Sequence, residues 1–159
     1  MEHITFTSPV LWSKIIVSIL CGSLVGLDRQ LRGKPAGIRT SSLITLGTTI
    51  FVMLGSIYEP GQTDRLRVLS QVVTGIGFLG AGVIMSKEGL VTGVTSASVI
   101  WVLATIGAAV GLGYFGMGLA VTIAAIAVLV GVELLEETFL KLQIGAHRRD
   151  NNRYEQPEE

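Results

Sequence analysis

Charged side chains are scarce in this chain of 159 residues, since Asp, Glu, Lys and Arg together make up 15% of it. A soluble globular domain carries about 25% charged residues. The few charges are also clustered, which leaves long uncharged runs, and hydrophobic residue types reach 49% of the chain. The composition therefore excludes an ordinary soluble domain and indicates a single membrane-embedded domain.

Cysteine and histidine are almost absent, with one Cys and two His residues. Cys21 lies in an apolar run and has no partner for an internal disulfide, so we interpret it as a small packing residue. His3 and His147 lie in the flanks, remote from any grouping of acid and nucleophile. We therefore expect no enzyme and no cofactor. The net charge of zero, without a basic stripe, argues against nucleic-acid binding.

Five apolar segments are each close to the length that crosses the roughly 30 Å hydrocarbon core as a helix. We predict an all-α polytopic membrane protein, a bundle of five transmembrane helices with a glycine-rich central helix. This domain is expected over residues 10–142, after an extracytoplasmic N-terminus at 1–9 and before a polar, disordered tail at 143–159. The five segments are 10–27, 41–57, 71–86, 94–112 and 114–132.

The Lys and Arg residues predict the orientation. Most of them lie in the first connection, at the turn around Lys87 and in the tail. The positive-inside rule therefore places the N-terminus outside and the C-terminus in the cytoplasm. Lys14, near the opposite side, is expected to extend its ammonium group to the outer interface.

The segment from Gln71 to Ser86 reads QVVTGIGFLGAGVIMS. Its small residues recur at helical spacing and leave flat faces that neighbouring backbones approach closely within a membrane. We predict that this is the inner helix of the bundle. The residues expected to pack are Gly75, Gly77, Gly80, Ala81 and Gly82. In the first segment, Gly22 and Gly26 form a second close-packing face.

The run from Gly75 to Gly80 also matches G-x-G-x-x-G, the dinucleotide-binding fingerprint. That motif requires a preceding strand, a following amphipathic helix and an acidic residue about 20 positions further on. The corresponding region, Val99 to Trp101, has no acid near it. Helix packing is therefore the favoured interpretation of these glycines.

Three motifs occur in one order along the chain: GLDRQLRGKPAGIRTSSLITLGTTIF, DRLRVLSQVVTGIGFLGAGVIM and VTGVTSASVIWVLATIGAAVGLGYF. With them the chain resembles the MgtC/SapB family of bacterial inner-membrane proteins. The resemblance implies a link to growth under magnesium limitation and, for some members, to survival inside macrophages. It also implies regulation through other membrane proteins, including the ATP synthase, rather than magnesium transport. Several members carry a C-terminal ligand-binding domain, for which too few residues follow the last segment here.

Polar residues between the first two segments form the first candidate site: Asp28, Arg29, Arg39 and Thr40. Charge and position alone leave two interpretations open, a functional cluster or an interfacial ion pair that sets the helix ends. The resemblance favours the functional cluster, because G-x-[ED]-R followed by A-G-x-R-T matches these positions. The family usually has Glu at the position of Asp28.

A second polar set precedes or begins the glycine-rich segment: Asp64, Arg65 and Gln71. Asp64 near a helix start is favourable with the helix dipole whatever the function. The Gln71 amide needs partners inside a membrane. We expect it to join a structural network with Thr45, Thr48, Thr95 or Ser98.

The function predicted first is a non-enzymatic regulatory membrane protein. The alternative is a transporter or channel subunit for Mg²⁺ or another small ion. Mg²⁺ is usually held by one or two carboxylates and water, yet no segment has an acid at its middle and Asp28 and Asp64 are expected on opposite faces. A metal site is therefore left undefined. The expected partners are the lipid bilayer, a second copy of the chain, and a membrane protein such as a transporter or an ATP synthase subunit.

Overall fold

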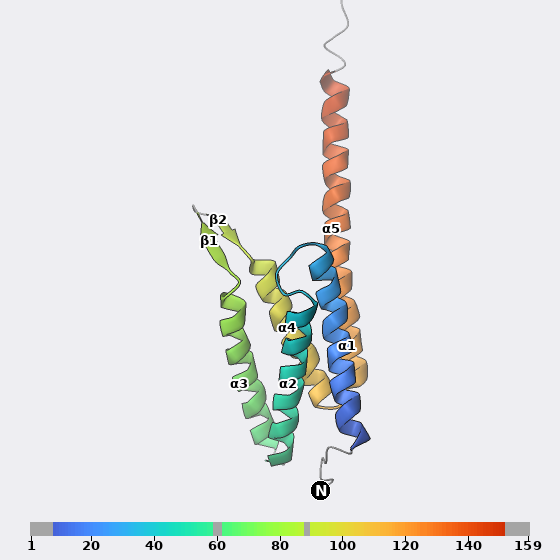
Figure 1. Cartoon of the computed structure of the whole chain (residues 1–159). Helices are drawn as coiled ribbons and strands as arrows, with labels where there is room; N and C mark the ends of the chain where they lie inside the picture. The colour runs from blue at the N-terminus through green and yellow to red at the C-terminus, as the bar shows by residue number, and fades with distance from the viewer. Residues whose placement is uncertain (1–7, 59–61, 88–89, 152–159) are drawn as a thin grey trace, which may run out of the picture. The chain divides into compact units, whose positions relative to one another are not determined.

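The computed structural model describes the backbone of residues 8–58, 62–87 and 90–151, and the side chains of 8–56, 67–86 and 90–135. The described residues form five α-helices and one antiparallel hairpin (Figure 1). The chain divides into two compact units, residues 1–125 and 126–159. The elements are α1 (Pro9–Leu31), α2 (Ile38–Tyr58), α3 (Gln62–Ala81), β1 (Met85–Lys87), β2 (Leu90–Thr92), α4 (Val94–Gly111) and α5 (Phe115–Asn151).

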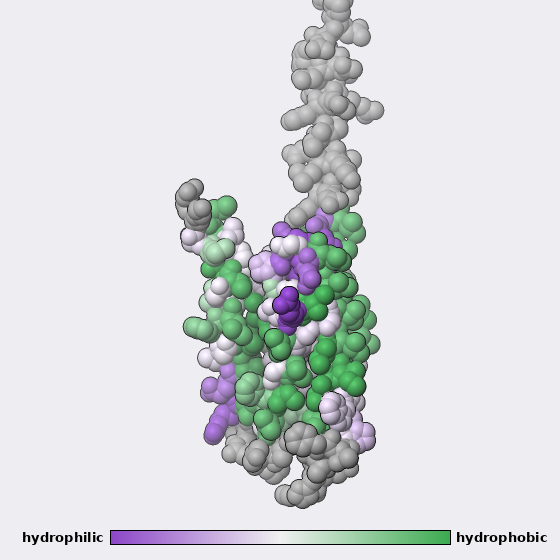
Figure 2. Space-filling model, in the orientation of Figure 1, coloured by the Kyte–Doolittle hydropathy of each residue, from purple (hydrophilic) through white to green (hydrophobic). Residues whose placement is uncertain are grey.

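Four of the helices in the described ranges are long and apolar enough to cross a membrane: Pro9–Leu31, Ile38–Ser56, Val94–Gly111 and Phe115–Leu135. In α3 the apolar part is shorter and covers Arg67–Ala81. Figure 2 shows that the face of the first unit is largely hydrophobic, with hydrophilic residues gathered near the α1–α2 connection and on α3 near its N-terminal end. The predicted all-α polytopic membrane protein is confirmed.

Glycine and proline set the helix boundaries. Pro9 occupies the first turn of α1, where a missing N–H costs nothing. Gly33, with φ +63°, turns the chain after α1, and Gly113, with φ +91°, turns it after α4. The backbone N–H of Tyr114 then donates to the carbonyl of Ala109, which closes the end of α4. The predicted break after the fourth apolar segment is confirmed.

The glycine-rich segment differs from its prediction, because its helix ends at Ala81 and not near Ser86. The last turn tightens as the N–H of Val83 donates to the carbonyl of Gly80. Glycine weakens a helix, and the residues that follow, Val83 and Ile84, favour extended backbone. The chain therefore continues into the β1–β2 hairpin, in which Ser86 pairs with Val91.

Helix α2 lies between α1, α3 and α4 within the first unit, whereas α3 packs against α2 and α4 at the edge (Figure 1). This differs from the inner position that the glycine pattern predicted for α3. A Cβ atom added at Gly75 or Gly77 would have nothing within 4 Å. Of the α3 glycines only Gly80 faces another helix, since a Cβ atom added there would lie 3.6 Å from the Cβ of Ala97. In this single chain, the small faces of α3 are thus mostly open.

Close packing occurs instead on both sides of α2. A Cβ atom at Gly26 would lie 2.7 Å from the Cα of Ile38, so α1 and α2 meet backbone to backbone. The predicted close-packing face of Gly22 and Gly26 is confirmed. On the other side of α2, a Cβ atom at Gly107 of α4 would lie 2.8 Å from the Cβ of Thr48. Such contacts provide the dispersion energy that holds helices together in a membrane.

Buried hydroxyl groups reinforce this packing. Thr45 Oγ1 donates to the carbonyl of Ser18 in α1 at 2.8 Å, and Thr49 Oγ1 donates to the carbonyl of Gly107 in α4 at 2.9 Å. Thr45 and Thr49 are both fully buried. These side chains of α2 therefore hydrogen-bond to the backbone of α1 and of α4.

Lys14 occupies a specific position in the bundle. Its Nζ atom donates to the carbonyl of Gly111 at 2.7 Å, at the last residue of α4. The ammonium group thus satisfies a terminal carbonyl and complements the negative end of the α4 dipole. The sequence pattern predicted an extension to the outer interface, and the structure adds this defined acceptor.

Replacing Lys14 by Met should therefore lower the free energy of unfolding by about 1 kcal/mol, since the Gly111 carbonyl loses its donor. The measurement is unfolding of the purified protein in mixed detergent and SDS micelles, followed by circular dichroism. Ser13→Ala is the matched control, because the Ser13 hydroxyl bonds only within α1 at an exposed position. Equal midpoints for both variants would show that the Lys14 contact contributes nothing.

Candidate functional site

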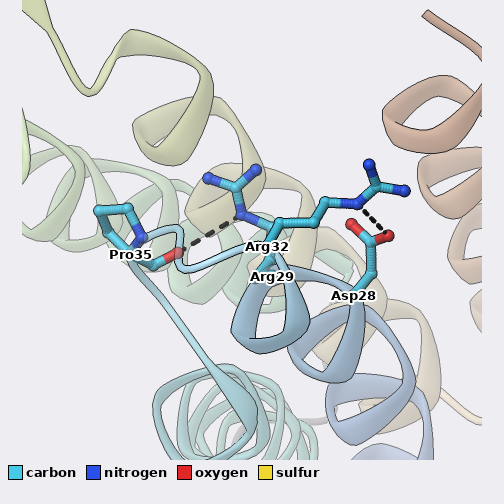
Figure 3. Close-up of polar contacts among 4 residues, drawn as sticks. All are labelled: Asp28, Arg29, Arg32 and Pro35. Carbon is cyan, nitrogen blue, oxygen red and sulfur yellow. Dashed lines mark hydrogen bonds and ion pairs between the residues drawn. The ribbon is translucent and has the colours of Figure 1, made fainter. Parts of the chain in front are cut away.

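Arg29 is a buried cation at the C-terminal end of α1. Only 4% of its surface is exposed. Its Nη2 atom donates to Ser96 Oγ in the first turn of α4 at 2.7 Å. Its Nε atom donates to the carbonyl of Pro35 at 3.4 Å, as Figure 3 shows. Both acceptors are neutral oxygen atoms. Burying a charge is costly unless it is hydrogen-bonded, so these contacts fix the guanidinium between α1, the α1–α2 connection and α4.

The connection after α1 is folded around this arginine. The N–H of Lys34 donates to the Arg29 carbonyl at 2.9 Å. Ala36 adopts a φ of +62°, a strained conformation for a residue with a side chain. The Ala36 carbonyl accepts a hydrogen bond from Ser41 Oγ at 2.8 Å. The Pro35 carbonyl is thereby held toward Arg29, and this turn leads directly into α2.

Asp28 points away from Arg29 and pairs with Arg32, one helical turn further along α1 (Figure 3). The Arg32 Nε atom donates to Asp28 Oδ1 at 2.7 Å. The Asp28 side chain is 12% exposed. Its second oxygen, Oδ2, is buried and has no hydrogen-bond partner among the described residues. A buried carboxylate oxygen without a donor is unfavourable, which makes it the most unusual polar atom of this region.

The structure separates the four residues predicted as one cluster. Arg29 bonds to Ser96, and Asp28 bonds to Arg32. Arg39 and Thr40 begin α2 with exposed side chains. Thr40 lines a different feature, a cavity between α2 and α3. The side chains of Asp64 and Arg65 lie outside the described residues.

The cavity between α2 and α3 has a volume of about 700 Å³. Most of its lining is apolar. Gln71 lines it, and the structure gives the Gln71 amide no hydrogen bond to another described residue. Two of the four expected partners bond elsewhere, since Thr45 bonds to the Ser18 carbonyl and Ser98 to the Val94 carbonyl, while Thr48 lines the same cavity as Gln71. The polar groups of the wall are Thr40, Thr48, Arg67 and Gln71.

Two residues of the buried arginine region were not predicted. The sequence offered a pattern that indicates Arg32, because an Arg four residues after an Asp can form an ion pair on a helix. No sequence pattern indicates Ser96, because it lies 67 positions from Arg29 and only the packing of α4 against α1 brings the two residues together. Among the residues with described side chains, no group of three His, Cys, Asp or Glu residues converges as a metal site.

The fold and this region define a polytopic α-helical membrane protein whose α1–α2 connection is organised around a buried arginine. The MgtC family profile matches residues 15–138. The chain belongs to the MgtC family. The match covers α1 from residue 15 onward, all of α2, α3 and α4, and the arginine region.

Relatives agree with this assignment. The chain is 40% identical over 109 residues to Protein MgtC of Salmonella typhimurium (strain LT2), which covers 69% of this chain and 46% of that protein. It is 40% identical over 113 residues to YhiD of Escherichia coli (strain K12), described as a proposed magnesium transporter, covering 66% of this chain and 52% of YhiD. A Haemophilus influenzae protein without a functional name is 35% identical over 134 residues, which cover 79% of this chain and 55% of that protein. The chain thus spans about half the length of these relatives. No solved structure matches it.

Proposed function

We propose that the chain is a non-enzymatic inner-membrane protein that supports adaptation to low magnesium by acting on other membrane proteins. In this proposal the N-terminus lies outside and the C-terminus in the cytoplasm, as the distribution of Lys and Arg favours. Family membership supports the link to magnesium. The regulatory role rests on how the bundle uses its interior polar groups.

The observation that carries the proposal is that polar side chains inside the bundle bond between helices. Thr45 and Thr49 bond to backbone carbonyls of α1 and α4, and Arg29 bonds to Ser96. Groups that coordinate a passing ion must exchange its water shell for their own oxygen atoms. Oxygen and donor groups engaged in helix packing are poorly suited to that exchange. The arrangement therefore favours a compact protein that acts through contacts.

The proposed contact surface is the open small-residue face of α3. Thr74, Gly77 and Ala81 share one side of this helix and are exposed. Lipid tails provide no hydrophobic drive for helix association, so small residues permit close packing with a partner. A second copy of the chain, a transporter and an ATP synthase subunit are the proposed partners.

A second function is kept because of Asp28. Its buried Oδ2 atom has no donor within the described residues, and an ionisable side chain at membrane depth is often functional. The name of the relative YhiD points to magnesium transport by that protein. The alternative is therefore an ion transporter or channel subunit in which Asp28 contacts the ion or a proton.

Two measurements on one protein preparation separate these functions. The first is growth in limiting magnesium of a bacterial strain that lacks its own MgtC-family protein and expresses this chain. The second is Mg²⁺ uptake into liposomes that contain the purified, folded protein. The regulatory proposal expects restored growth and no uptake above that of protein-free liposomes. Uptake that depends on the protein and is lost in Asp28→Asn would establish the transporter instead.

Replacing Asp28 by Asn should abolish growth support while the protein still accumulates in the membrane. The ion pair to Arg32 is an i, i+4 pair, and such pairs stabilise a helix by only about 0.5 kcal/mol. Unfolding would therefore not explain the loss. Asp28→Glu is the matched control, since it keeps the charge, and it should retain most of the growth. Full growth with Asp28→Asn would remove Asp28 from the site.

A further inference from the structure

A groove runs along the α2–α3 contact in the first unit, with glycine on both walls. Gly47 of α2 and Gly75 of α3 line it, and a Cβ atom added at either glycine would have nothing within 4 Å. The groove holds about 700 Å³. The two glycines thus keep open a space that ordinary side chains would fill. In a membrane such a space is occupied by hydrocarbon or by another protein segment.

The polar groups of the α3 wall lie at one end of this groove. Arg67 and Gln71 are one helical turn apart, so they share a face. Arg67 begins the apolar part of α3, and everything from Val72 to Leu79 on this wall is apolar or glycine. The α2 wall adds the hydroxyl groups of Thr40 and Thr48, and the rest of the lining is apolar or glycine. A cation above a mostly apolar groove complements a molecule with an anionic head and a hydrocarbon tail.

The dimensions favour a lipid over a helix. The wall from Arg67 to Leu79 rises about 18 Å, close to the roughly 15 Å of hydrocarbon in one leaflet. The groove volume spread over that length corresponds to a section of about 40 Å². A helix 10 Å wide has a section of roughly 80 Å². A groove of this section matches hydrocarbon chains more closely than it matches a complete helix.

We propose that the α2–α3 groove binds one phospholipid of the surrounding leaflet. Its phosphate accepts charge-assisted hydrogen bonds from the Arg67 guanidinium, and an ester carbonyl accepts a hydrogen bond from the Gln71 amide. An acyl chain lies along the glycine walls toward Leu79. This site is independent of the proposed regulatory function, and a transporter of the same fold would contain it as well.

The test is native mass spectrometry of the full chain, released from detergent micelles after titration with palmitoyl-oleoyl phosphatidylglycerol. Wild-type protein should retain one lipid. Gly75→Leu and Gly47→Leu place a side chain in the groove at positions where an added Cβ atom meets nothing within 4 Å, and Arg67→Ala removes the proposed phosphate ligand. Each should lower the bound fraction about tenfold. Gly116→Leu is the matched control, because Gly116 is equally open but does not line the groove, and it should bind like the wild type.

Melting curves in detergent confirm that each variant is folded before its lipid binding is compared. Equal retention by the wild type and both groove-filling variants would overturn the proposal, since the lipid would then bind elsewhere. A polypeptide that copurifies in the groove and is displaced by Gly75→Leu, with no lipid bound, would overturn it in favour of a partner helix. Arg67→Lys provides a further check, because it should restore part of the binding that Arg67→Ala loses.

Discussion

Replacing Gly107 by Leu should prevent α4 from packing against α2 and should nearly abolish folded protein in the membrane. Even a Cβ atom at Gly107 would contact the Thr45 carbonyl and lie 2.8 Å from the Cβ of Thr48. The nearest obstacle is the backbone carbonyl of Thr45, which cannot rotate away as a side chain can. Overpacking of a tight core costs about 1–3 kcal/mol and occasionally more. A leucine here adds three further carbon atoms, so we expect about 3 kcal/mol or more.

The Gly107→Leu substitution also lowers stability in a second way, besides the steric overlap. Thr49 donates its hydroxyl to the Gly107 carbonyl, so a shift of α4 also breaks a buried hydrogen bond. A buried hydroxyl left without a partner costs about 1–3 kcal/mol. The total approaches the 5–15 kcal/mol by which folded proteins are stable.

The measurement is the yield of monodisperse protein in detergent together with its unfolding midpoint in SDS. Gly116→Leu is the matched control, since Gly116 is a helical glycine with nothing within 4 Å of an added Cβ atom. It should accumulate and melt like the wild type. Gly107→Ala should fall between the two. A Gly107→Leu protein with the wild-type midpoint would contradict the close approach of α2 and α4.

Replacing Arg29 by Ala should remove growth support in limiting magnesium and lower the free energy of unfolding by about 3 kcal/mol. The substitution leaves Ser96 Oγ and the Pro35 carbonyl without their donor. It also leaves a cavity where the guanidinium was buried. The α1–α2 connection would then lose its contact with α4. Arg29→Lys should recover only part of the stability, because one ammonium group on a flexible stem cannot reproduce the planar fork.

A double-mutant cycle separates the Arg29–Ser96 contact from other effects. Arg29→Ala, Ser96→Ala and the double variant are compared in SDS unfolding. A hydrogen bond to a charged group contributes about 1.5–3 kcal/mol, so we expect a coupling energy in that range. Ser98→Ala is the control, because the Ser98 hydroxyl bonds within α4 at an exposed position. Additive effects of Arg29→Ala and Ser96→Ala would show that the two residues do not interact.

The candidate site was only partly predictable. Asp28 and Arg29 were identified from the end of an apolar segment, and both are indeed largely buried polar residues of α1. Their hydrogen-bond partners, Arg32 for Asp28 and Ser96 for Arg29, were not predicted. Adjacent residues on a helix point about 100° apart, so Asp28 and Arg29 face different neighbours instead of pairing. Arg39 was grouped with them because it precedes the second segment and matches the family pattern A-G-x-R-T, yet it lies exposed at the start of α2.

Local chemistry alone determined most of the helices and their limits, whereas α3 ended earlier than predicted. Apolar length identified the spanning helices, Gly113 ended α4, and the spacing of Gly22 and Gly26 identified a close-packed face. Each of these properties depends on residues within one or two turns. Only the tertiary structure decided which faces meet. Glycine spacing permits close approach but does not attract a partner, so α4 uses Gly107 against α2 while the glycines of α3 remain mostly open. The contacts of Lys14 with Gly111 and of Arg29 with Ser96 follow from that packing, because no local pattern specifies an acceptor on a distant helix.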